Sequence, residues 1–241
     1  MRGLKAPISG SISNKLYQPT AGDGCVLWLP GQDDPQSATI RDRSGKLNNG
    51  TIAGATWVRN SKGLQYLSFD GDDYVNCGTS STIDFGWTTP FSIGCWINTS
   101  QASGSYRSLI GRASTSAGLL FSIWGTKADI FLCKTYTADS IRVYSSNAVN
   151  DGVWRLVFVT YDGSATAAGT KVYVDGVDKS TIGIDALTGE FKQTDKSFSM
   201  AVISGWNSYT GLIALPRAFN VARTAAQIAS IYRQERSLFG V

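Results

Sequence analysis

Short apolar runs recur along almost the whole chain, and they constrain its fold more than any other feature. The run 154–161 carries Leu, Val, Phe and Tyr at positions of both parities, so both faces of a strand here would be apolar. Such a strand belongs in the middle of a sandwich. Similar strand-like runs occupy 25–29, 66–69, 74–77, 91–97, 108–112, 119–124, 130–135, 141–145, 171–174, 198–203 and 210–219. Many short strands at such spacing predict an all-β, antiparallel sandwich.

Turn dipeptides separate these runs, as a sandwich requires. They are Asn49-Gly50, Asp70-Gly71, Asp162-Gly163 and Asp175-Gly176. The composition agrees, with 26 glycines, 11% aromatic residues and only 17% charged residues. A chain of 241 residues is long enough for one such sandwich to bury its core without a disulfide or metal.

One helix is predicted near 224–236. Thr224 and Gln227 have the spacing of a capping box. Ala225, Ile228, Ile231 and Tyr232 then form one apolar stripe, so we expect this helix to pack against the sandwich.

Residues 1–22 differ from the domain that follows at 23–241. Prolines and glycines disfavour a helix there, and the apolar side chains fall on even positions, which share one face of an extended chain. We predict an extended N-terminal arm, the alternative being a free tail. The residues expected to bind a partner are Arg2, Leu4, Lys5, Ile8, Ile12, Lys15 and Leu16.

The net charge of +4 is concentrated in this arm. Arg2, Lys5 and Lys15 precede the first acidic residue, Asp23, and leave 19 basic against 18 acidic side chains in the rest of the chain. A nearly neutral body argues against nucleic acid as a partner.

The cysteines and the N-terminus bear on location. Cys25, Cys77, Cys95 and Cys133 form no CxxC pair and lie in apolar runs, so we expect four free thiols. No signal-peptide-like or membrane-spanning run is present, which predicts synthesis in the cytoplasm and no membrane partner.

In their order, the motifs resemble the laminin-G-like and concanavalin-A-like jelly roll over about residues 22–235. The resemblance is carried by the segments 24–30, 42–51, 67–75, 91–97, 154–163 and 172–176. Of these, 67–75 (Leu-Ser-Phe-Asp-Gly-Asp-Asp-Tyr-Val) is similar to a hairpin of that family. The resemblance implies a jelly roll, but such a fold hosts lectins, enzymes, adhesins and virion proteins.

The resemblance also implies a calcium ligand near the end of the domain, where family members often have Asp. This chain has Ala214 there, so we predict no metal site and no calcium dependence. Asp70, Asp72 and Asp73 are the densest acidic cluster; a cation-binding loop is one interpretation, and a turn that bonds its own backbone amides is the favoured one.

Catalysis is not expected. The chain has no histidine, which excludes the nucleophile systems that need one. Glycosidases need two carboxylates beside the bond they cleave, and the only glutamates, Glu190 and Glu235, are far apart in sequence. We therefore predict a non-enzyme without a cofactor.

Aromatic residues in predicted loops indicate a possible glycan site. Trp206, Asn207 and Tyr209 combine flat apolar surfaces with a polar group, as sugar binding requires. Trp87 and Trp124 have similar settings, and packing at strand ends is the favoured explanation for these aromatic residues.

Two functions remain. The first is a structural protein of a bacteriophage virion, such as a capsid decoration or head-surface protein, attached to neighbouring virion subunits by its arm. The alternative is a carbohydrate-binding, lectin-like module for adhesion to a host or glycan.

Overall fold

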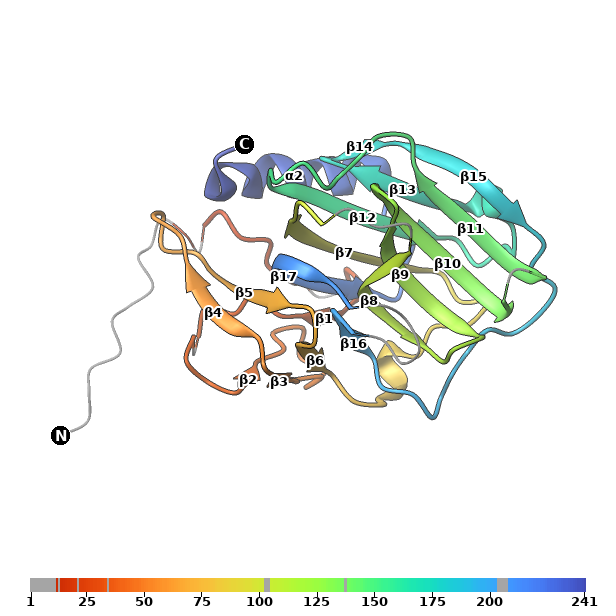
Figure 1. Cartoon of the computed structure of the whole chain (residues 1–241), viewed down its shortest axis with the longest axis horizontal. Helices are drawn as coiled ribbons and strands as arrows, with labels where there is room; N and C mark the ends of the chain where they lie inside the picture. Colours follow the sequence, from red (N-terminus) through yellow and green to blue (C-terminus); the bar gives the residue numbers. More distant parts are fainter. Residues whose placement is uncertain are drawn as a thin grey trace.

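Two antiparallel sheets pack face to face as a sandwich (Figure 1). The computed structural model describes residues 12, 14–20, 22–33, 35–101, 105–136, 138–202 and 208–241. The eight-stranded sheet has the order β14-β13-β12-β7-β17-β5-β4, with β1 paired to β17. Its strands are β1 (Cys25–Trp28), β4 (Thr56–Arg59), β5 (Gln65–Asp70), β7 (Phe91–Asn98), β12 (Arg155–Tyr161), β13 (Thr170–Val174), β14 (Val177–Asp178) and β17 (Thr210–Phe219).

The nine-stranded sheet has the order β15-β11-β10-β9-β8-β16-β6-β3-β2. Its strands are β2 (Thr39–Ile40), β3 (Gly50–Ala53), β6 (Tyr74–Asn76), β8 (Tyr106–Ala113), β9 (Gly118–Trp124), β10 (Lys127–Thr135), β11 (Asp139–Ser145), β15 (Ser180–Asp185) and β16 (Ser199–Met200). Short 3₁₀ turns, η1 (Ser81–Ile83) and η2 (Ala167–Gly169), lie between strands. The predicted β-sandwich is confirmed, and β2, β3, β4, β14 and β15 are additions to the predicted strands.

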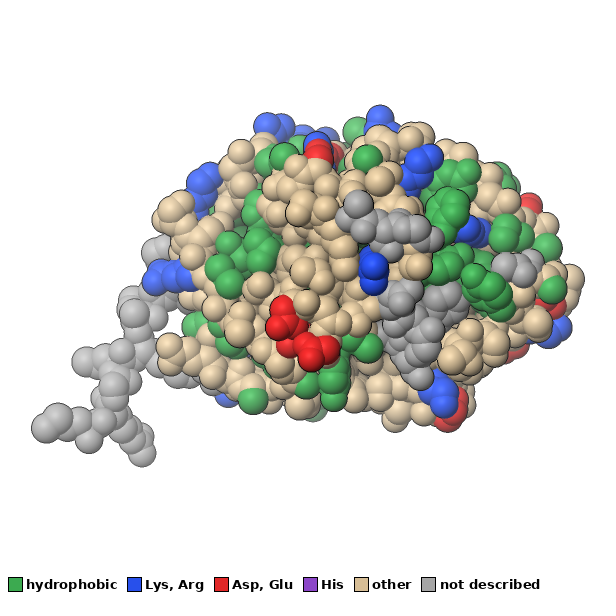
Figure 2. Space-filling view, in the orientation of Figure 1, with side chains coloured by type: hydrophobic (Ala, Val, Ile, Leu, Met, Phe, Trp, Pro, Cys, Tyr) green, Lys and Arg blue, Asp and Glu red, His purple; other side chains and the backbone are tan. Residues whose placement is uncertain are grey.

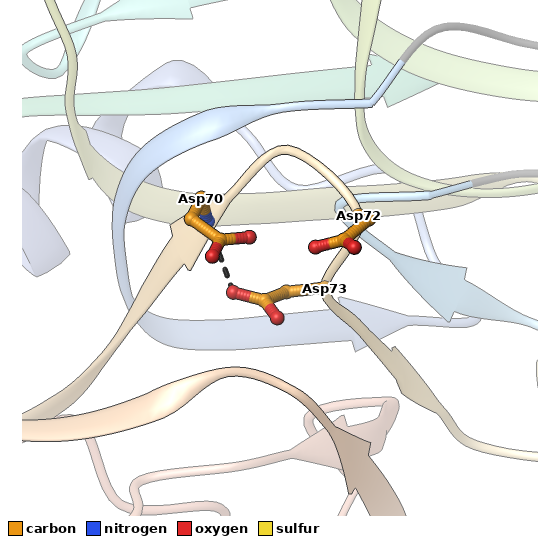
Figure 3. Close-up of side chains that lie close together, drawn as sticks. All are labelled: Asp70, Asp72 and Asp73. Carbon is orange, nitrogen blue, oxygen red and sulfur yellow. Dashed lines mark hydrogen bonds between the residues drawn. The ribbon is translucent and has the colours of Figure 1, made fainter.

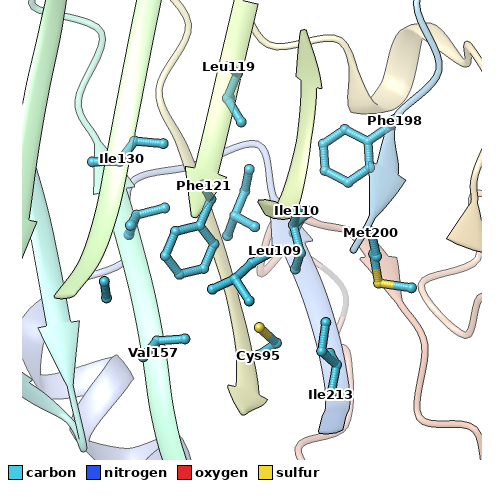
Figure 4. Close-up of a cluster of buried hydrophobic side chains, with 14 of the residues drawn as sticks. Cys95, Leu109, Ile110, Leu119, Phe121, Ile130, Val157, Phe198, Met200 and Ile213 are labelled. Carbon is cyan, nitrogen blue, oxygen red and sulfur yellow. The ribbon is translucent and has the colours of Figure 1, made fainter. Parts of the chain in front are cut away.

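The main core fills the space between the sheets (Figure 4). Phe121 and Ile130 of one sheet and Val157 and Ile213 of the other are at most 3% exposed. Because side chains alternate along a strand, the inward residues of β9, β10 and β11 leave every second residue for the outer face of the sheet.

Helix α2 (Ala225–Phe239) covers the outer face of the eight-stranded sheet. The Thr224 hydroxyl accepts from the Gln227 amide and the Gln227 side chain accepts from the Thr224 amide, which confirms the capping box. The helix ends three residues later than predicted, at Phe239, and is capped by Gly240, whose left-handed backbone (φ 78°) suits glycine. Among the described residues, no helix is long and apolar enough to cross a membrane.

The part of the predicted extended arm that the structure describes, residues 12, 14–20 and 22, does not run straight, and residues 1–11 lie outside the described chain. The Lys15 amide donates to the Ile12 carbonyl at 2.9 Å, so the backbone turns there. Ile12, Leu16 and Tyr17 are 4–8% exposed and pack with α2 and the eight-stranded sheet. This segment turns because its apolar side chains find a surface on the same chain.

The predicted turns divide into two kinds. Asp175-Gly176 joins β13 to β14 with positive φ at both residues, as a two-residue hairpin requires. Asp70-Gly71 instead carries the chain from β5 in one sheet to β6 in the other, so the expected hairpin is a crossing between sheets. All four cysteines are buried and free, as predicted.

Candidate functional site

Polar and aromatic side chains form rows across the outer face of the nine-stranded sheet. In the first row, Tyr106 is paired with Trp124, and Trp124 with Lys127. In the second, Ser108 is paired with Ser122, Ser122 with Asp129, and Asp129 with Tyr144. Paired residues share a face, and their sequence neighbours Ile123, Ala128, Ile130 and Val143 lie in the core between the sheets. The two rows therefore point away from that core.

Arg142 from β11 joins these rows into one cluster. Its Nε donates to Asp129 Oδ1 at 2.7 Å. Its guanidinium carbon lies 3.6 Å from the Trp124 ring centroid, 5.1 Å from that of Tyr106 and 5.8 Å from that of Tyr144. Lys127 Nζ lies 4.9 Å from the Tyr144 centroid, so both cations contact aromatic faces. We name this cluster the Arg142 site; it comprises Tyr106, Ser108, Ser122, Trp124, Lys127, Asp129, Arg142 and Tyr144.

Trp124, Tyr144 and Lys127 are half-buried. The Arg142 side chain is only 12% exposed, and Asp129 has no exposed surface. Figure 2 shows hydrophobic side chains, with basic ones beside them, on the face of the molecule where β10 and β11 lie. The site therefore has an accessible aromatic layer above a buried carboxylate.

The environment of Asp129 is unusual for a charged residue. Burial raises the pKa of Asp129 to about 6, although Arg142 and a 3.3 Å hydrogen bond from Ser122 oppose that shift. A carboxylate held where its charge is costly, in an aromatic site, is typical of residues kept for function.

Two buried polar atoms of the site also lack partners. Ser108 Oγ and Arg142 Nη2 have no hydrogen-bond partner among the described residues. Buried polar groups are usually paired, so unpaired ones in a native site need an explanation. A polar ligand or ordered water that completes them would provide one.

Replacing Asp129 with asparagine is expected to remove a pH-dependent loss of stability. Because the pKa is raised from 3.8 to about 6 on folding, the protonated carboxyl favours the folded state below about pH 4. That contribution is lost as the pH rises through about 6. The stability of wild type relative to Asp129→Asn should therefore fall by about 3 kcal/mol between pH 3.5 and 7, as measured by urea unfolding.

Asp195→Asn is the control for this measurement. Asp195 is exposed, and a hydrogen bond from Lys196 lowers its pKa, so its replacement should produce no such loss. Parallel pH curves for wild type and Asp129→Asn would contradict the raised pKa.

The predicted arm residues are only partly within the described chain. Arg2, Leu4, Lys5 and Ile8 lie outside the described residues. Lys15 is exposed. Ile12 and Leu16, in contrast, are buried against their own domain, so these two side chains are not free to contact a partner.

The predicted glycan-binding loop is also only partly within the described chain. Trp206 and Asn207 lie outside the described residues. Tyr209 is fully buried, and its hydroxyl lies 3.1 Å from the Leu212 carbonyl oxygen and 3.2 Å from that of Asn98. Its ring packs on Phe69 inside the sandwich, so the favoured packing explanation is confirmed for Tyr209 and it cannot serve as an exposed platform for sugar.

Trp124 is the one residue of the site that the sequence indicated, as a loop aromatic. Asp129, Arg142 and Tyr144 were missed. Their signal was present in β10 and β11, where apolar residues alternate with Asp129, Phe131, Arg142 and Tyr144. That alternation identifies an outer face, although it does not show which strands lie side by side.

Asp70, Asp72 and Asp73 do lie together, with carboxylate oxygens within 4.8 Å of one another (Figure 3). Asp73 Oδ2 accepts a 2.9 Å hydrogen bond from the Asp70 amide, which supports the predicted role in the turn. Burial raises the pKa of Asp73, whereas a hydrogen bond with Asp72 lowers that of Asp70.

Ala214, at the position of the expected calcium ligand, is buried in the apolar cluster beneath α2. Calcium independence stays a prediction.

Apart from the Arg142 site, a hollow of about 410 Å³ lies beside the start of β1. It is lined by Pro19, Thr20, Gly22, Asp23, Gly24, Cys25, Val26, Ser44, Lys46, Asn220 and Val221. Its carboxylate, Asp23, already accepts hydrogen bonds from Tyr17, Thr20 and Cys25. The Asp23 carboxylate is therefore already bound to groups of its own chain.

The chain is similar to known proteins in fold. A family model described as the concanavalin A-like lectin/glucanases superfamily matches residues 69–229, which confirms the resemblance inferred from the sequence. No curated protein sequence matches significantly.

Solved structures share the fold at low sequence identity. Domain 4 of an extracellular arabinanase from Geobacillus stearothermophilus, in complex with arabinotriose, has a TM-score of 0.64 and is 16% identical over 86% of this chain and 98% of that one. The binding domain of Paraclostridial Mosquitocidal Protein 1 has a TM-score of 0.68 and is 13% identical over 87% of this chain and 52% of that one.

A third solved structure is of botulinum neurotoxin type C, whose cell entry is described as dependent upon interaction with two ganglioside molecules. Its TM-score is 0.64, and it is 16% identical over 88% of this chain and 51% of that one. The chain thus spans about half the length of the two toxin structures. At these identities the likeness shows the fold alone.

Proposed function

Since the chain belongs to the concanavalin A-like lectin/glucanases superfamily, we propose that it is a non-enzymatic module that binds carbohydrate on the outer face of its nine-stranded sheet. The proposal rests chiefly on the Arg142 site. There, a guanidinium lies over a half-buried indole, and two buried polar atoms have no hydrogen-bond partner among the described residues. Sugar sites combine a flat apolar platform with a few fixed polar groups. The similar arabinanase domain, solved with arabinotriose, supports the same class of ligand.

The carboxylates argue for binding rather than hydrolysis. Asp129 is the only carboxylate in the two rows of the Arg142 site, whereas glycosidases use a pair. Glu235 is committed to an ion pair beneath α2, on the outer side of the other sheet. Glu190 accepts hydrogen bonds from the backbone amides of Trp87 and Lys192. The described glutamates therefore have structural partners elsewhere.

Assembly into a virion stays a prediction that we place second. It depended on an arm free to attach to neighbouring subunits, and Ile12 and Leu16 are occupied by their own domain. The remaining apolar arm residues, Leu4 and Ile8, lie outside the described chain. The proposed carbohydrate site, in contrast, consists of residues that the structure describes.

Trp124→Ala is expected to weaken glycan binding at least tenfold with little change in stability. The indole is half-buried on the outer face, and stacking of an apolar sugar face on it would be lost. The measurement is a glycan-array screen with the wild type, followed by calorimetric titration of the glycans that bind.

Tyr74→Ala is the matched control, because it removes a 40%-exposed aromatic from β6 of the same sheet, far from Arg142 in strand order. Equal affinities of wild type and Trp124→Ala for the bound glycans would place the binding site elsewhere. A wild type that binds no glycan would overturn the proposed function.

A further inference from the structure

Arg142 uses its hydrogen-bonding capacity incompletely. Its Nε bonds to Asp129, while its buried Nη2 has no partner among the described residues. Arg217 differs, because Nη1 and Nη2 both donate to Glu235 and Nε donates to the Leu215 carbonyl. An arginine that only held a buried carboxylate in place would be expected to approach it with two parallel bonds, as Arg217 does. The arrangement of Arg142 leaves donor capacity for a second acceptor.

The charges around Arg142 favour an anion as that acceptor. Arg142 and Lys127 bring two positive charges to the site, and Asp129 brings one negative charge. On β10 and β11 a second described ion pair, Lys134 with Asp139, lies at the far end of the hairpin, and its two charges neutralise each other. Above the pKa of Asp129 the site therefore carries one net positive charge, set among aromatic rings that exclude water.

The shape of the site indicates which class of anion can bind there. A guanidinium is planar and matches a carboxylate with two donors. It lies over one face of the half-buried Trp124 ring, and the part of the indole that it leaves uncovered provides an apolar surface. A ligand that satisfies both has an apolar ring face and a carboxylate on the same ring. Sugars with a carboxylate, such as uronic and sialic acids, combine these two features.

We propose that Arg142 makes the site selective for carboxylate-bearing sugars, an inference that rests on the carbohydrate-binding function proposed above. In this role Arg142 binds the carboxylate of the sugar, and Trp124 packs against the sugar ring. Asp129 holds the guanidinium over the indole. Lys127 adds to the attraction without a fixed geometry.

The test compares each acidic sugar with a neutral counterpart of the same backbone. The probes are trigalacturonate and its carboxyl-reduced form, and sialyllactose and lactose, titrated by calorimetry. We expect wild type to bind at least one acidic probe about tenfold more tightly than its neutral counterpart. Arg142→Gln should abolish that preference, and Arg142→Lys should retain a weaker, more salt-sensitive one because it keeps the charge without the fork.

Arg142→Gln leaves Asp129 buried without its cation, so Arg142→Gln/Asp129→Asn is measured beside it as a variant free of that charge. Lys134→Gln is the matched control, because it removes an exposed positive charge from the neighbouring strand β10, outside the site. It should keep the preference for the acidic probe.

The outcomes separate the two proposals. Equal binding of acidic and neutral probes, or an acidic preference that survives in both Arg142→Gln variants, overturns the selectivity and leaves carbohydrate binding intact. Tighter binding of a sulfated trigalactoside than of trigalacturonate overturns the assignment to carboxylates. If wild type binds no sugar of either kind and none on the glycan array, the proposed function itself fails.

Discussion

Replacing Glu235 with alanine is expected to lower the free energy of unfolding by about 3–5 kcal/mol, because it leaves a buried arginine without its counter-ion. Glu235 and Arg217 both have fully buried side chains, and two hydrogen bonds of 2.8–2.9 Å join them. Trp96 Nε1 donates to the same carboxylate at 2.8 Å, and the Tyr17 amide donates at 3.1 Å. One side chain of α2 thus connects both β7 and β17 to the chain before β1.

The double variant Arg217→Met/Glu235→Leu tests the cause. Apolar replacement of a whole buried ion pair is often neutral or stabilising, whereas removal of one partner is costly. The double variant should therefore recover most of the stability that Glu235→Ala loses in chemical unfolding. A loss below about 1 kcal/mol in the single variant, or an equal loss in both, would contradict the explanation.

Deleting residues 1–20 is expected to cost about 4 kcal/mol of stability or more, because three apolar side chains of this segment are buried against the domain. Ile12, Leu16 and Tyr17 are each at least 92% buried. Truncating one such buried side chain to alanine typically costs about 2–5 kcal/mol. The deletion also removes the Tyr17 ring, which packs edge-on to Trp28 and Phe219 at 5.6 Å, and a backbone donor to Glu235.

A deletion of residues 1–11 provides the comparison, since it keeps these contacts. The difference between the unfolding free energies of the two deletions measures what 12–20 contributes. Leu16→Ala in the full chain should reproduce part of it, at about 2 kcal/mol or more. If the two deletions unfold at the same denaturant concentration, the segment does not stabilise the sandwich.

The deletion prediction departs from the extended, partner-binding arm that the sequence predicted for this segment, and the reason is physical. Even spacing of apolar residues at Ile12 and Leu16 fits an extended strand and one helical turn equally well. The surface against which these side chains pack decides between the two conformations. Here Gln234 of α2 donates to the Leu16 carbonyl, 218 residues away in sequence, and no local pattern encodes that contact.

Other features were local and therefore predictable. The Thr224–Gln227 cap depends on atoms three residues apart, and the helix begins where the sequence indicated. The Asp42 loop is similar, because its carboxylate accepts hydrogen bonds from the Ser44 and Asn48 amides within the same turn. The Asp70-Gly71 turn was also recognised, but its local chemistry could not show that β5 and β6 belong to different sheets.

By itself the sequence determined that this protein is a β-sandwich with a capped C-terminal helix, because strand alternation, turn chemistry and capping act between near neighbours along the chain. The tertiary structure decided where a ligand can bind. Asp129 and Arg142 meet because β10 and β11 pair in one register, and Tyr106 joins them through β9. A shift of one residue in any of these pairings would turn the site into the core. Register is set by the packing of both sheets together, so it is a property of the folded chain rather than of any one segment.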